Sequence, residues 1–62
     1  MHPLEEEIKS IVEEFLAGKI TLEEKTYLLQ EIRDVRIAQE CADDGERVRI
    51  VAHVCNMALA LS

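Results

Sequence analysis

The sequence predicts an all-α protein, built as a small helical hairpin followed by a third, very apolar helix. Apolar residues recur at helical spacing along most of the 62-residue chain. A helix-capping signature stands at residues 21–24, in the first half of the chain. With two glycines and one proline, the chain has little of the turn chemistry that an all-β fold needs. We expect residues 1–62 to form a single small helical domain.

The first helix is expected from about Pro3 to Ala17. Proline suits the first helical position, where no intrahelical N–H bond is lost, and three glutamates follow it near the positive end of the helix dipole. At about 100° per residue, the apolar positions fall within one arc. They are Leu4, Ile8, Ile11, Val12, Phe15 and Leu16. Gly18 then fits a left-handed C-terminal cap.

The second helix is expected to begin at Thr21, where Thr21 and Glu24 have the spacing of a capping box. From Leu28 onward, the pattern predicts a packed seam with alternating steps of four and three residues. The seam consists of Leu28, Ile32, Val35, Gln39 and Ala42, and Ile37 lies off it. Residues 8–24 resemble a short helical hairpin used by small bacterial oligomerisation motifs, a resemblance that implies no function.

A second break is expected at residues 43–46, Asp-Asp-Gly-Glu. Asp43 and Glu46 again have capping-box spacing, and Gly45 lowers the helix propensity by about 1 kcal/mol relative to alanine. One glycine does not force a turn, so a single helix from Leu22 to Leu61 is the alternative.

The third helix is expected from about Glu46 to Leu61, with apolar residues over more than half of its circumference. Because β-branched residues alternate between Arg47 and Cys55, a strand is the alternative there. A helix this apolar must be buried on most sides, and two amphipathic helices offer too little surface to cover it. We therefore expect a homodimer or higher oligomer. Its expected interface consists of Val48, Val51, Ala52, Val54, Cys55, Ala58 and Leu59.

Thirteen acidic and seven basic residues give a net charge of −6, which disfavours direct binding to nucleic acid or to anionic membranes. No stretch is long and apolar enough for a transmembrane helix, and no signal peptide is recognisable, so a cytoplasmic location is expected. Every arginine lies in the second half of the chain, and arginine is favoured at interfaces. The expected contacts with an unidentified protein partner are Arg33, Arg36, Ile37, Arg47 and Arg49.

The sequence offers no catalytic, cofactor-binding or metal-binding set that we can defend. His53 and Cys55 are two positions apart, which places them on different sides of a helix, and Cys41 is distant. We therefore expect a non-catalytic protein that acts by protein–protein interaction, as a homo-oligomeric regulator or adaptor. Two alternatives remain open: an acidic inhibitor that mimics nucleic acid, and a metal- or thiol-responsive regulator using Cys41 and Cys55.

Overall fold

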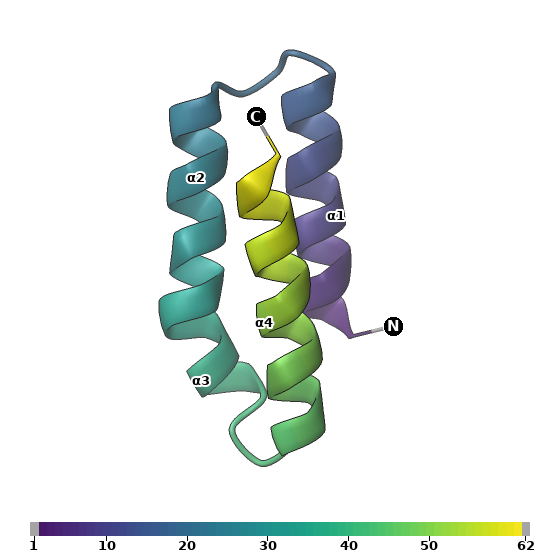
Figure 1. Ribbon diagram of the computed structural model, residues 1–62, viewed down its shortest axis with the longest axis vertical. Helices are drawn as coiled ribbons and strands as arrows, with labels where there is room; N and C mark the ends of the chain where they lie inside the picture. The colour runs from purple at the N-terminus through teal and green to yellow at the C-terminus, as the bar shows by residue number, and fades with distance from the viewer. Residues whose placement is uncertain (1, 62) are drawn as a thin grey trace.

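A computed structural model describes residues 2–61 and shows three helical rods in a compact bundle (Figure 1). The second rod is continuous but consists of three elements, α2, the π-helical segment η1, and α3. The bounds are α1, Pro3–Leu16; α2, Leu22–Glu31; η1, Ile32–Arg36; α3, Ile37–Glu40; and α4, Gly45–Ala60. The all-α prediction is confirmed over these residues, and both the strand at 47–55 and the single helix from Leu22 to Leu61 are wrong.

The first and last helices, α1 and α4, run in the same direction, and the rod formed by α2, η1 and α3 runs in the opposite direction (Figure 1). The last helix lies against both of the others. The molecule measures 35 × 20 × 16 Å along its principal axes. No helix within residues 2–61 is both long and apolar enough to cross a membrane.

Local capping fixes both ends of the first connection. Gly18 has a φ of +77°, and its amide donates to the Phe15 carbonyl, while the Lys19 amide donates to the Glu14 carbonyl. These two bonds form a Schellman motif, which confirms the predicted glycine cap. The Thr21 hydroxyl accepts from the Glu24 amide at 3.1 Å, and the Glu24 carboxylate accepts from the Thr21 amide at 3.0 Å. The predicted capping box is therefore confirmed.

The π-helical segment η1 changes which side of the second rod is buried. The Ile37 amide bonds to the Ile32 carbonyl five residues earlier, so the turn contains one extra residue. As a result Ile32 and Ile37 both face the core, with 1% and 5% of their surface exposed, whereas Val35 is 44% exposed. The expected seam through Val35 is therefore wrong, and so is the placement of Ile37 off the buried side.

The second break reverses the chain between α3 and α4, one residue later than the predicted cap. Asp44, not Asp43, is the N-cap of α4, and its carboxylate accepts a hydrogen bond from the Arg47 amide at 3.0 Å. Gly45 is the first residue of the helix. The carboxylate is well placed there because it meets unpaired amides at the positive end of the helix dipole.

The core is aliphatic and lies where the three rods meet. Its buried hydrophobic members are Leu4, Ile8, Ile11, Leu29, Ile32, Ile37, Cys41, Val51, Cys55 and Ala58. One charged residue, Lys25, is also fully buried. The core therefore contains residues from every helical element, and α4 contributes three of them.

Candidate functional site

The seven residues expected at an oligomer interface fall into two groups. Val51, Cys55 and Ala58 are buried by the chain's own helices, with at most 5% of their surface exposed. The others, Val48, Ala52, Val54 and Leu59, are half-buried and pack against the edge of the core. A single chain thus covers the centre of the predicted surface and leaves only its margins for another molecule.

The arginines expected to contact a partner are largely engaged within the chain. Arg36 forms ion pairs with Glu40 and, at 3.1 Å, with Glu7 of α1. The hydrogen bonds that Arg36 donates to these two carboxylates raise its pKa. The Arg47 guanidinium pairs with Glu5, which ties α4 to α1. The pairs with Glu7 and Glu5 join the second rod and α4 to α1.

The remaining predicted partner contacts differ in exposure. Arg33 pairs with its neighbour Asp34 at 2.9 Å, and this hydrogen bond lowers the pKa of the Asp34 carboxyl. Arg49 is exposed, whereas Ile37 is buried and has no surface to offer. The five residues therefore do not form one continuous docking patch.

The two thiols are free and buried. Cys55 donates a long, weak hydrogen bond to the Leu29 carbonyl, with 3.6 Å between sulfur and oxygen. Burial raises the pKa of the Cys55 thiol, which disfavours the reactive thiolate. Within residues 2–61, no three or more histidine, cysteine or acidic side chains gather as metal ligands.

Cys41 contacts His2, whose role as a helix cap the sequence analysis missed. The Nδ1 atom of His2 caps α1 by accepting from the Leu4 amide at 3.0 Å. In the neutral ring the proton must then be on Nε2, which lies 3.5 Å from the Cys41 sulfur. This contact fastens the start of α1 to the end of α3.

Lys25 is the second residue that sequence analysis missed. Its ammonium group donates to the carbonyls of Ala58, at 2.9 Å, and Leu61, and lies 4.6 Å from the centroid of the Phe15 ring. These bonds satisfy carbonyl oxygens at the negative end of α4. Spacing could have indicated its burial, because Lys25 lies four positions before the core residue Leu29 and so on the same face of the helix.

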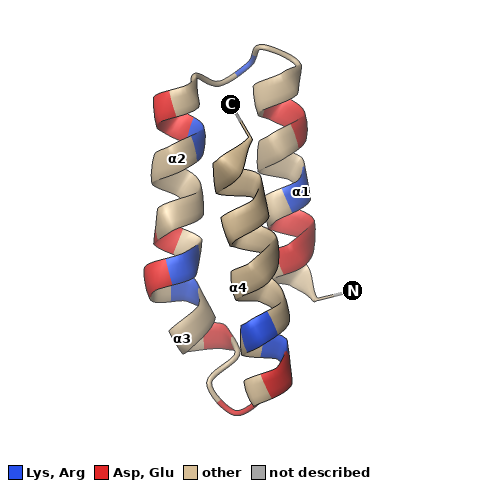
Figure 2. Ribbon diagram, in the orientation of Figure 1, with Lys and Arg blue, Asp and Glu red and all other residues tan. Residues whose placement is uncertain are grey.

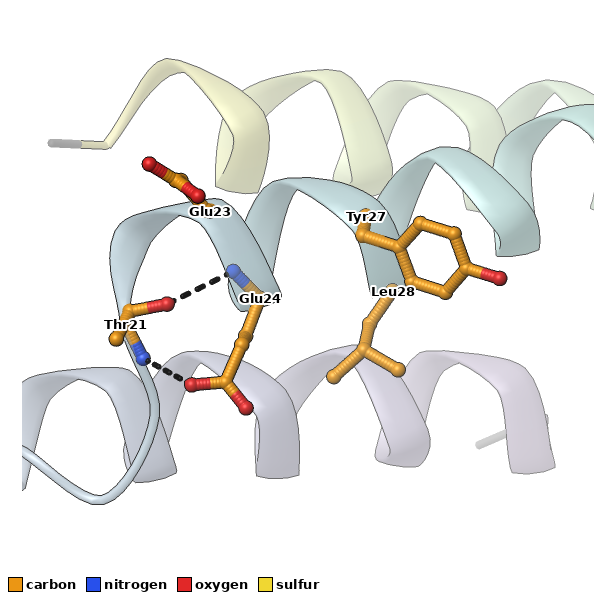
Figure 3. Close-up of a pocket in the computed structure, with 5 residues that line it drawn as sticks. All are labelled: Thr21, Glu23, Glu24, Tyr27 and Leu28. Carbon is orange, nitrogen blue, oxygen red and sulfur yellow. Dashed lines mark hydrogen bonds between the residues drawn. The ribbon is translucent and has the colours of Figure 1, made fainter.

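One surface hollow, of about 300 Å³, lies on the first turns of α2 and is shown in Figure 3. It is lined by Thr21, Glu23, Glu24, Tyr27 and Leu28. The dashed lines in Figure 3 show that Thr21 and Glu24 bond each other in the capping box. Because all five residues come from the start of one helix, this hollow lacks the opposing wall that a ligand site needs.

A second hollow, of about 360 Å³, lies between two helices, and we call it the α1–α4 groove. Its lining consists of Glu5, Ile8, Lys9 and Val12 of α1 together with Val54, Met57, Ala58 and Leu61 at the end of the chain. Two of these residues are charged, and one of them, Glu5, is already paired with Arg47. The floor and both walls are therefore predominantly apolar.

A largely exposed apolar stripe includes three residues of the α1–α4 groove and extends beyond it along α4. It consists of Ile50, Val54, Met57 and Leu61, spaced by steps of four, three and four residues. Ile50 is 38% exposed, Met57 59% and Leu61 47%. This spacing is typical of a helix that packs along another helix. The stripe and the groove together form the candidate interaction surface.

Comparison of the chain with protein-family models, with curated proteins and with solved structures gave no significant match. The functional interpretation therefore depends on the surface of this chain alone.

Proposed function

We propose that this is a non-catalytic helical interaction protein, a small homo-oligomeric regulator or adaptor that acts through the α1–α4 groove. The observation that carries the proposal is an apolar groove beside an exposed apolar stripe. Soluble proteins rarely leave such surface uncovered unless it binds another molecule. A helix laid along the groove would reach Val12 on one wall and Met57 on the other, which is the usual mode of helix-in-groove recognition.

The groove supports the proposal better than the arginine-bearing surface expected from the sequence. Arg36 and Arg47 already pair with carboxylates of α1, and pulling them towards a partner would break those pairs. Arg49 is exposed, whereas the other three arginines are half-buried. Arg49 lies on α4, the helix that also forms one wall of the groove. The proposed binding surface is therefore centred on the groove.

Two observations support this proposal over its two alternatives. An acidic mimic of nucleic acid needs rows of free carboxylates, and two of the five glutamates of α1, Glu5 and Glu7, are engaged by Arg47 and Arg36. A metal- or thiol-responsive regulator needs accessible thiols, but Cys41 and Cys55 are both buried.

A comparative capture experiment tests the proposal. The full chain and two variants, Met57→Glu in the stripe and Val35→Glu on η1, would each be immobilised and exposed to extract from the source cells. Both replaced side chains are exposed, at 59% and 44%, so the two substitutions are matched in kind and burial. We expect a protein that binds the wild type and Val35→Glu but not Met57→Glu, because the new carboxylate must be desolvated in the groove.

Two results would contradict the adaptor role. One is that the three immobilised chains capture the same proteins, which would mean that the groove does not select them. The other is that the wild type captures nothing. Circular dichroism of each variant would check that the helices are retained.

A further inference from the structure

We propose that the α1–α4 groove is filled by the same face of a second copy of this chain, packed antiparallel about a two-fold axis. The inference rests on the proposed function and names the partner. The two copies would contact each other along the stripe of Ile50, Val54, Met57 and Leu61, with the two-fold axis between Val54 and Met57.

Shape is the first argument for a second copy. A two-fold interface joins identical faces, so one face must carry both the projecting and the receiving parts. Here Met57 and Leu61 project at the edge of a groove whose floor contains Ile8. The stripe's alternating spacing of four and three residues lets its side chains pack between those of an identical helix.

Area is the second argument. A standard protein interface takes about 800 Å² from each partner. That is roughly one long side of a molecule measuring 35 × 20 × 16 Å. A lone helix, with a diameter of about 10 Å, would cover only part of the width of such a side. The paired helices α1 and α4 of a second copy would cover its whole width.

Charge is the third argument, because the net charge of −6 would otherwise oppose self-association. No aspartate or glutamate occurs from Arg47 to Leu61. Figure 2 shows α4 without charged residues beyond its first turns. On the α1 wall Glu5 is paired with Arg47, and Lys9 adds a positive charge. The contact face therefore carries little of the chain's acidic excess.

The direction of the helices favours the antiparallel arrangement. The two helices of the contact face, α1 and α4, run in the same direction (Figure 1). Antiparallel packing sets the positive ends of their helix dipoles beside the negative ends of the same helices in the other copy, whereas parallel packing sets like ends together.

Sedimentation equilibrium of the full chain tests the choice of partner. We expect the wild type and Val35→Glu to sediment at twice the chain mass of 7.1 kDa, and Met57→Glu to sediment as a monomer. The two-fold axis places two new carboxylates in one interface, so the dissociation constant should rise about a hundredfold or more. A wild type that stays monomeric up to about 1 mM, or a dimer that Met57→Glu leaves intact, would overturn the inference.

Disulfide trapping tests the antiparallel orientation. A mixture of Ile50→Cys and Leu61→Cys chains should cross-link under mild oxidation, because these positions meet between antiparallel copies. Each variant alone should not cross-link through its new thiol, and the wild type, whose thiols are buried, is the matched control. Cross-linking of each single variant with itself would instead show parallel packing and overturn the arrangement.

The failures of the two proposals are distinguishable. A monomeric wild type that still captures a protein in a Met57-dependent way would refute the second copy and support the adaptor role. A wild type that dimerises through the groove but captures nothing would support the second copy and refute the adaptor role.

Discussion

The two flanks of α4 differ in how completely the chain covers them. On the α2 side, Cys55 is fully buried and bonds the Leu29 carbonyl, and Leu59 is half-buried against the core. On the α1 side, Met57 and Leu61 are 59% and 47% exposed. The α2 flank of α4 is therefore closed, and the α1 flank is open.

The difference follows from what each neighbour presents to α4. The second rod presents large aliphatic residues, and the π-turn of η1 rotates Ile37 inwards to add to them. On the α1 side of the groove, Ile8 is buried at the floor, and Glu5, Lys9 and the smaller Val12 lie above it. A chain of this size has few aliphatic side chains to spare, and on the α1 side they leave Met57 and Leu61 exposed.

Truncation on the closed side should have the largest effect. We expect Ile37→Ala to lower the free energy of unfolding by about 2–5 kcal/mol, because it leaves a cavity in the core. Its neighbour Val35→Ala, at an exposed position, should cost about 0.5 kcal/mol or less. Urea denaturation followed by circular dichroism measures both. If Val35→Ala were the more damaging substitution, the register produced by the π-turn would be refuted.

The contrast between Ile37 and Val35 also shows which features of the fold the sequence could not predict. Strong local signals predicted the start of α1, the Gly18 cap and the Thr21 capping box, because each depends on residues within one turn. No residue within Ile32–Arg36 predicts the π-turn, which is recognised only by the hydrogen bond from the Ile37 amide to the Ile32 carbonyl. A regular helical period was therefore extended through it, and Ile37 was assigned to the wrong side.

Sequence reasoning met the same limit at the candidate site. Periodicity showed that α4 is apolar over most of its circumference, but not which part the other helices cover. Val51 and Cys55 were therefore grouped with Val54, although only the last lines the groove. Lys25 was overlooked because its partners are carbonyls of Ala58 and Leu61, more than thirty residues away.

Replacing buried Lys25 should have an intermediate effect on the free energy of unfolding. The structural change should be confined to the C-terminal end of α4, where Lys25 bonds. We expect Lys25→Met to lower the free energy of unfolding by about 1–3 kcal/mol, because two hydrogen bonds to carbonyls and the contact with Phe15 are lost. Hydrogen exchange should accelerate most at the last turn of α4. The exposed Lys19→Met is the control, and an equal loss in that variant would contradict the role of Lys25.

The pH dependence of the closed flank should be the smallest effect. The folded state holds the Cys55 pKa above its ordinary value of 9.0, mainly through burial. A thiol with a raised pKa contributes stability that is present below the unfolded pKa and is lost as the pH rises through the folded value. The wild type should therefore lose stability above about pH 9 more steeply than Cys55→Ala. Urea denaturation at a series of pH values measures both stability profiles. Identical slopes for the two chains would contradict this contribution of Cys55.

The open flank is tested most directly by following the backbone amide resonances of the full chain by NMR as it is diluted. If a second copy covers this flank, the resonances that change with concentration will be those of Val12, Val54, Met57 and Leu61. Those of Val35 and Tyr27, on the second rod, will stay constant. Resonances that are independent of concentration throughout, or changes that gather at Val35 and Tyr27, would contradict the account.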